Sequence, residues 1–172
     1  GHQCRHRRDF EMGLMGIPSD KWYAKGLRFE CRLCGRCCAG PEEGYIWLTG
    51  RELSRAAEFL KMSPQVFRER FVRRIGFWMS LLEHPQTKDC IFLTDIGLGR
   101  RGCAIYPVRP LQCCTWPFWT ENLRSIYTWE KAAAKCPGIN QGPLWSFEEI
   151  ERRRTAKSGF DGLSGADSPA GS

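Results

Sequence analysis

The sequence is short of several features that define common protein classes. It has no run of about 18 consecutive apolar residues, which a membrane-spanning helix needs. It contains three histidines, and the isolated His84 is expected to be solvated rather than to bind a metal. It also has no glycine-rich loop for a nucleotide or S-adenosylmethionine, and no acid–base pair suited to catalysis. These absences argue against a membrane-spanning protein and against an enzyme that acts alone.

The net charge of +7 makes RNA a partner to consider. Lysines and arginines are spread over residues 5–8, 51–74, 100–109 and 152–157 instead of forming one block. Such spreading is typical of solvated faces and helix ends, whereas a phosphate-binding track gathers its charge on one surface. Both interpretations stay open from the sequence.

Cysteine is the residue that the chain has in quantity. Four of its ten cysteines fall within eight residues, in the run Cys31-Arg32-Leu33-Cys34-Gly35-Arg36-Cys37-Cys38. Two residues between cysteines let both sulfurs reach one metal, and Gly35 allows a tight turn. Leu33 is the only large apolar side chain in the run, so little here can pack as an ordinary core. We therefore predict a metal centre.

Disulfides are the alternative use of these thiols. Ten cysteines in 172 residues fall below the density of about 8–10% that is typical of small secreted disulfide scaffolds. The adjacent pairs Cys37-Cys38 and Cys113-Cys114 also suit a disulfide framework poorly, because neighbouring cysteines bridge each other only through a strained ring. Metal-bound thiolates are favoured, and they imply a reducing compartment. We expect the mitochondrial matrix or another organelle interior, with the cytoplasm as the alternative.

Short strands are expected around the cysteines. Residues 27–30 and 45–48 have strand-like patterns on the two sides of the cysteine run. Residues 90–106 contain two strand-like stretches with a glycine-containing turn between them. This pattern predicts a hairpin that holds one cysteine on each arm, Cys90 and Cys103.

Helix starts are marked by capping residues. A capping box, in which a Thr or Ser hydroxyl and a Glu carboxylate satisfy free N–H groups, opens helices after Thr49 and Ser146. The first is expected to run to about residue 61 and the second to about residue 157. Ser63 followed by proline starts another helix. Its predicted buried stripe consists of Val66, Phe67, Phe71 and either Val72 or Ile75.

These patterns predict an α+β fold, a small metal-organised domain with short hairpins and three or four helices, flanked by irregular N- and C-terminal arms. Residues 1–20 would form a basic N-terminal arm and residues 21–157 the cysteine-cluster metal-binding domain. Residues 158–172 are rich in Gly and Ser and would form a flexible tail.

Four motifs occur in an order that resembles a known family: the cysteine run, Arg109-Pro110-Leu111-Gln112-Cys113, Trp116-Pro117-Phe118 and Cys136-Pro137-Gly138. From about residue 29 to 150 the chain resembles the YkgJ-type cysteine-cluster proteins, described as zinc- or iron-chelating domains. Cys114 departs from the family pattern and Cys4 lies outside the resemblance, so both are weaker metal candidates. The resemblance implies eight metal-binding positions, which match Cys31, Cys34, Cys37, Cys38, Cys90, Cys103, Cys113 and Cys136.

Eight thiols divide into two four-cysteine sites, and four thiolates suit tetrahedral zinc as well as a [4Fe–4S] or [2Fe–2S] cluster. Cys37 and Cys38 would point to opposite sides of an extended backbone, which favours two sites, although they could also serve different irons of one cluster. Trp116, Phe118 and Trp119 are expected to shield thiolates from water. The arginines that could balance thiolate charge, or simply be solvated, are Arg32, Arg36, Arg101 and Arg109.

Three functions follow from this chemistry. The first is a structural metal module that serves as a protein subunit of a larger assembly, with RNA as a further partner to consider. The second is an iron–sulfur protein with a redox or enzyme-accessory role, because the resemblance also reaches flagellin lysine methylases. The third is a metal carrier, which would need labile, exposed thiolates.

Overall fold

The computed structural model describes residues 20–157, so the tail and all but the last residue of the expected basic arm, with Cys4, lie outside the described residues. The described chain mixes helices with antiparallel strands, which confirms the α+β class. None of the helices in this part of the chain has the length and apolarity to cross a membrane. The elements are β1 (Leu27–Phe29), the 3₁₀ turn η1 (Arg36–Cys38), β2 (Trp47–Leu48), α1 (Gly50–Phe59), α2 (Pro64–Phe71), β3 (Val72–Ile75), β4 (Trp78–Leu81), β5 (Leu93–Gly97), β6 (Arg100–Cys103), the 3₁₀ turn η2 (Tyr106–Val108), α3 (Leu111–Thr115), α4 (Thr120–Leu123), α5 (Ile126–Lys135), β7 (Ile139–Trp145) and α6 (Phe147–Arg154).

The predicted helix starts are confirmed. Both capping boxes form, at Thr49 before α1 and at Ser146 before α6, and the Ser63 hydroxyl accepts a hydrogen bond at the start of α2. The predicted stripe of α2 is only partly right, because the helix ends at Phe71 and the chain continues as β3. Phe67 is fully buried, whereas Val66 and Ile75 are 38% and 37% exposed.

The predicted hairpin forms as β5 and β6, but both strands lie closer to the turn than expected, at Leu93–Gly97 and Arg100–Cys103. Leu98 and Gly99 make the turn with φ angles of 55° and 67°, and two positive φ values are what a tight two-residue hairpin turn requires. Cys103 lies on β6, paired with Leu93. Cys90 precedes β5 and forms a bridge with Glu83 instead, so the expectation of a cysteine on each arm was wrong for Cys90.

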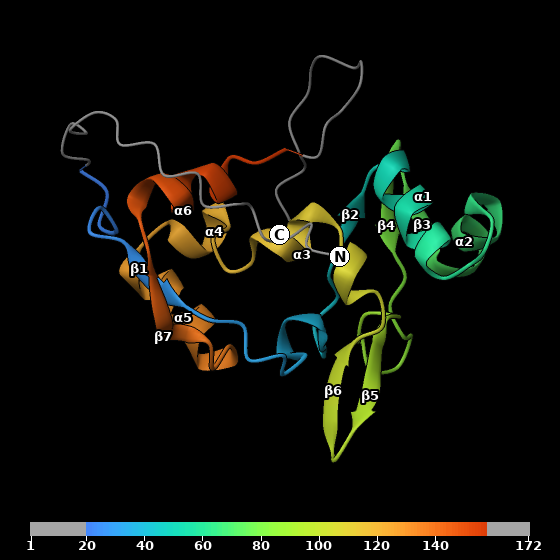
Figure 1. The fold of residues 1–172 in the computed structure, drawn as a ribbon, viewed down its shortest axis with the longest axis horizontal. Coiled ribbons are helices and arrows are strands. Elements are labelled where there is room, and N and C mark those ends of the chain that lie inside the picture. Colours follow the sequence, from blue (N-terminus) through green and yellow to red (C-terminus); the bar gives the residue numbers. More distant parts are fainter. Residues whose placement is uncertain (1–19, 158–172) are drawn as a thin grey trace.

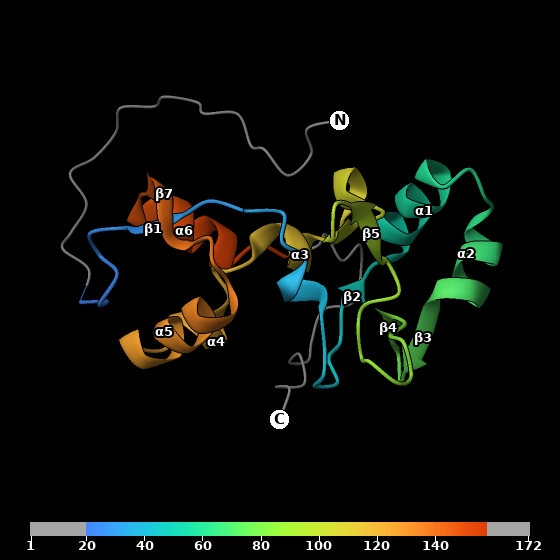
Figure 2. The ribbon, with the colours of Figure 1, turned by 90° about the horizontal axis from the view of Figure 1, so that it is seen from below.

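Two hydrophobic clusters organise the described chain. Figures 1 and 2 place α1, α2, β3 and β4 at one end of the molecule and β1, β7, α5 and α6 at the other, with α3 between them. We call the first the central cluster, because its residues come from the middle of the sequence, and the second the terminal cluster. The central cluster contains Leu48, Leu53, Ala56, Ala57, Phe67, Leu81, Cys90, Phe92 and Ile105, and the terminal cluster Tyr23, Phe29, Phe118, Leu123, Trp129, Ala132, Cys136, Ile139 and Ile150.

The terminal cluster joins the two ends of the described chain. β1 pairs antiparallel with β7, and the Trp145 indole N–H donates to the carbonyl of Phe29 at 2.9 Å. Trp129 is buried under this pair and stacks on Phe118 at 6.0 Å between ring centroids. Neither α5 nor β7 was predicted from the sequence.

Glu151 on α6 anchors the segment before β1. Its carboxylate accepts hydrogen bonds from Lys21 at 2.6 Å, from the Tyr23 hydroxyl at 2.7 Å and from Arg154 at 2.7 Å. The Arg154 bond, helped by those from Lys21 and Tyr23 and opposed by burial, lowers the pKa of Glu151 to about 2.

Acid should therefore weaken this anchor. A lowered pKa adds stability above the ordinary value of 4.5, and that stability is lost as the pH falls towards about 2. We expect Glu151→Gln to cost about 1–2 kcal/mol near neutral pH, a value discounted for partial solvent exposure. Urea unfolding between pH 6 and pH 3 should show this difference shrinking, and a difference that stays constant with pH would contradict the assignment.

Candidate metal centre

The chain crosses between the two clusters twice, and both crossings carry cysteines. The first, residues 30–45, contains the whole cysteine run, and the second, residues 109–115, contains Cys113. Cys90 belongs to the central cluster and Cys136 to the terminal cluster. The cysteines therefore gather where the two halves of the molecule meet.

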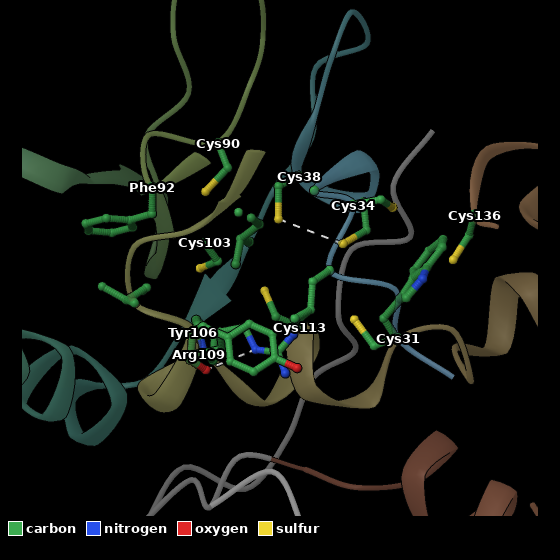
Figure 3. A pocket seen from close by; sticks show the side chains of 18 of the residues that line it. Cys31, Cys34, Cys38, Cys90, Phe92, Cys103, Tyr106, Arg109, Cys113 and Cys136 are labelled. Carbon is green, nitrogen blue, oxygen red and sulfur yellow. Dashed lines mark hydrogen bonds between the residues drawn. The ribbon is translucent and has the colours of Figure 1, made fainter. Parts of the chain in front are cut away.

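All eight cysteines implied by the resemblance line one cavity of about 60 Å³, which has room for several water-sized groups. In Figure 3, Cys90 and Cys103 lie on one side of this cavity, Cys136 lies on the other, and Cys38 and Cys113 lie between them. Cys90 and Cys136 are buried, whereas Cys31 and Cys37 are exposed; the remaining four are partly buried.

The cysteine run turns tightly at Gly35. This glycine has φ 69°, and a Cβ there would lie 2.8 Å from Leu93 Cδ1, so both its conformation and its surroundings favour glycine. The following residues form η1, which brings the sulfurs of Cys37 and Cys38 to 3.8 Å from each other. The expectation that these two side chains point apart was wrong, because the backbone here is a 3₁₀ turn and not extended.

The end of the cysteine run is fastened to the segment that carries Cys90. The N–H of Cys90 donates to the carbonyl of Cys38 at 2.7 Å. Asp89 accepts from the N–H of Gly40 at 2.8 Å and from Arg101 at 2.9 Å, and the Gly40 bond is the main reason that the pKa of Asp89 is lowered. One carboxylate thus ties the cysteine run to β6.

Two side chains that the sequence analysis did not single out position Cys113. Glu52 of α1 accepts from the N–H of Leu111 at 2.8 Å, at the start of α3. Gln112 accepts from the N–H of Trp47 at 2.8 Å and donates to the carbonyl of Tyr45 at 2.9 Å. The sequence motif that ends in Cys113 includes Gln112. Its hydrogen bonds to residues 45 and 47 could not be predicted, because they form only once β2 packs beside α3.

Cys136 reaches the cavity through the backbone of the terminal cluster. It caps the end of α5, and two residues later the carbonyl of Gly138 accepts from the N–H of Glu30 at 3.0 Å. Because Cys31 directly follows Glu30, this one bond brings Cys31 and Cys136 to the same cavity.

Burial and mutual contact set the protonation of the thiols. The hydrogen bond from Cys38, opposed by loss of water around the sulfur and helped by the charge of Arg109, lowers the pKa of Cys37 to about 7. The same bond is the main cause that raises the pKa of Cys38. Burial raises the pKa of Cys90 to about 11 and that of Cys113 as well. A metal would have to displace protons from these sulfurs in order to bind them.

Arg109 is the arginine most directly placed to balance thiolate charge. It lines the cavity, its Nε donates to the carbonyl of Tyr106 at 3.1 Å, and its guanidinium carbon lies 3.7 Å from the Tyr106 ring centroid. Within residues 20–157 it makes no ion pair. Arg32 also lines the cavity but pairs with Glu30 at 3.2 Å, and Arg101 is held by Asp89.

Several predicted candidates lie elsewhere. Cys114 is disulfide-bonded, and its sulfur lies 3.6 Å from the carbonyl oxygen of Arg109. His84 is exposed and, with Cys114, is absent from the cavity lining. Phe118 is buried in the same cluster as Cys136 and is not in the cavity lining, whereas Trp116 does line the cavity.

Comparison with known proteins places the chain in a family. A family model described as "CxxCxxCC: Putative zinc- or iron-chelating domain" matches residues 30–137. The chain belongs to the CxxCxxCC family. It is also 32% identical over 96 residues to "Uncharacterized protein MJ0661" of Methanocaldococcus jannaschii, a match that covers 56% of this chain and 48% of that relative. The chain thus aligns with about half of that relative's length. No solved structure matches the chain.

The residues at the cavity fit the chelating chemistry of the CxxCxxCC family. Thiolates are the ligands that zinc and iron–sulfur clusters prefer, and none of the described residues that line the cavity has a carboxylate, which would suit harder cations. Tetrahedral zinc, with Zn–S of about 2.3 Å, needs sulfurs about 3.8 Å apart, and Cys37 and Cys38 are at that separation. Among the described residues no three His, Cys, Asp or Glu side chains converge on a single ion position. The sulfurs surround a space instead of meeting at a point.

Proposed function

We propose that this CxxCxxCC protein is a structural metal module in which thiolate-bound metal holds the central and terminal clusters together. The proposal rests on which parts of the chain supply the cysteines of the cavity. Cys90 and Cys103 come from the side of the central cluster, Cys136 comes from the terminal cluster, and the other five lie on the crossings between them. Metal bound to sulfurs from both sides would close the interface, and its binding free energy would become folding free energy.

We further propose that the module serves as a subunit of a larger assembly. Among the described residues eight cysteines are free thiols and one, Cys114, is disulfide-bonded and lies off the cavity, so the balance favours a reducing compartment, an organelle interior or the cytoplasm. Two large apolar side chains at hairpin turns are almost fully exposed, Phe77 at 96% and Leu98 at 97%. Their exposure supports the proposal that a macromolecular partner covers them. The net charge of +7 keeps RNA among the candidate partners.

An iron–sulfur cluster is the second candidate for the bound group. It is favoured by the arrangement of the sulfurs around a space, because a cluster takes its ligands at several separate irons. Such a cluster would give the protein a redox or enzyme-accessory role, supplied by the cluster's ability to accept and release electrons.

Metal analysis of the full chain, purified without oxygen, tests both candidates. We expect zinc, with no absorption in the visible range, if the module is purely structural. Iron with an equal amount of acid-labile sulfide and visible absorption would select the iron–sulfur alternative. Absence of metal together with thiols oxidised in pairs would overturn both.

A further inference from the structure

The indole of Trp116 carries a polar group with no partner. Its Nε1–H is buried and meets no hydrogen-bond acceptor in the described chain. A buried donor without an acceptor is costly, and native structures seldom keep one without a reason. Trp119, the next tryptophan along the chain, donates to the carbonyl of Gln112 at 2.9 Å, so the missing partner distinguishes Trp116 from its neighbour.

The Trp116 side chain lies in the wall of the cysteine-lined cavity. It lines the main cavity and also a smaller adjoining pocket of about 20 Å³, whose lining includes Cys37, Cys38 and Cys113. Its ring packs edge-on against Trp119, with 4.8 Å between the centroids and 82° between the planes, and this packing fixes the direction of the indole. The ring that carries the buried donor therefore forms part of the wall of the thiol-lined space.

The rest of the cavity lining, as far as residues 20–157 form it, supplies further donors and no carboxylate. Apart from the cysteines, its polar side chains in this part of the chain are those of Arg32, Tyr106, Arg109 and Trp116. A neutral thiol is a weak acceptor, whereas a thiolate sulfur bound to metal carries negative charge and accepts hydrogen bonds well. The lining is therefore suited to an anionic sulfur centre.

We propose that the Trp116 Nε1–H donates a hydrogen bond to a metal-bound cysteine sulfur in this cavity. This inference rests on the proposed function, because only a bound metal makes the sulfur an anionic acceptor. Trp116 is then a positioning residue: its donor, which has no partner among the described residues, gains an acceptor when the metal is bound. The difference between the two states favours the metal-bound form.

A pair of matched substitutions tests the role of this N–H. Trp116→Phe removes the unpartnered donor, whereas Trp22→Phe, at a tryptophan outside both cavity linings, removes a similar volume together with a hydrogen bond to the Leu123 carbonyl that exists without metal. In the full chain we expect Trp116→Phe to weaken zinc binding about tenfold, the lower end of the effect of losing a supporting hydrogen bond at a metal site. Trp22→Phe should lower the stability of the zinc-free and zinc-bound forms alike and leave the affinity within about twofold, within the usual spread for additive effects. Equal zinc affinities of Trp116→Phe and the unsubstituted chain would overturn the proposal.

A second measurement needs no substitution. In the unsubstituted chain, the Trp116 indole proton should exchange with solvent more slowly after zinc is added, and its nitrogen-15-resolved NMR signal should move downfield. An indole signal that is the same with and without zinc would overturn the proposal while leaving the metal module intact. If the chain binds neither zinc nor iron, the proposed function fails first, and the role of Trp116 fails with it.

Discussion

Removal of the bound metal is expected to separate the two halves of the domain. Binding of structural zinc contributes about 10–16 kcal/mol to the folding free energy of small zinc domains. The whole free energy of unfolding of a native domain is about 5–15 kcal/mol. The metal-free chain should therefore be much less stable, and its two halves should unfold separately instead of in one cooperative transition. The loss should be greatest in the terminal cluster, which depends on pairing β1 with the distant β7.

Hydrogen exchange of the zinc-bound and chelator-treated chains would check this expectation. Amides of β1, β7 and α5 should lose protection first, while amides of α1 and α2, whose contacts are more local, should keep more of theirs. Adding zinc back under reducing conditions is the control and should restore protection. Unchanged protection without metal would mean that the two clusters hold together by packing alone.

The second large effect is a loss of stability that we expect when one methyl group is added at Gly138. A Cβ at this position would lie 2.1 Å from the carbonyl oxygen of Glu30, and a backbone atom within a paired segment cannot move aside cheaply. We expect Gly138→Ala to destabilise the protein by about 3 kcal/mol. It should also weaken metal binding, because the same contact brings Cys31 and Cys136 to the cavity.

Gly50 offers a matched control for that substitution. It lies at the start of α1 and a Cβ there would meet nothing within 4 Å, so Gly50→Ala should be neutral or slightly stabilising. Chemical unfolding of both variants, followed by zinc titration, provides the comparison. Equal stabilities of the two variants would show that the Gly138–Glu30 contact can open without cost.

Local signals predicted the parts of the fold that depend on near neighbours. The capping residues Thr49, Ser63 and Ser146 act on N–H groups within three residues, so their helices could be located from sequence. The β5–β6 hairpin was found for the same reason. β7 was missed because its strand state depends on β1, at the other end of the described chain.

The candidate site was likewise predicted from the sequence only in part. The cysteine spacing and the resemblance together picked out all eight thiols that line the cavity. The relation of Cys37 to Cys38 was mispredicted, because a 3₁₀ turn and an extended backbone are equally compatible with two adjacent cysteines. The support from Glu52 and Gln112 and the unpartnered indole of Trp116 depend on tertiary contacts, which a single sequence does not reveal.

The pairing of β1 with β7 also bears on the order of events during synthesis. Trp145 and its acceptor Phe29 are 116 residues apart, so a nascent chain displays the cysteine run long before its distant ligand candidate, Cys136, leaves the ribosome. The central cluster, with more local contacts, can form first. Capture of the proposed metal by sulfurs from both clusters would therefore have to wait until nearly the whole domain has been translated.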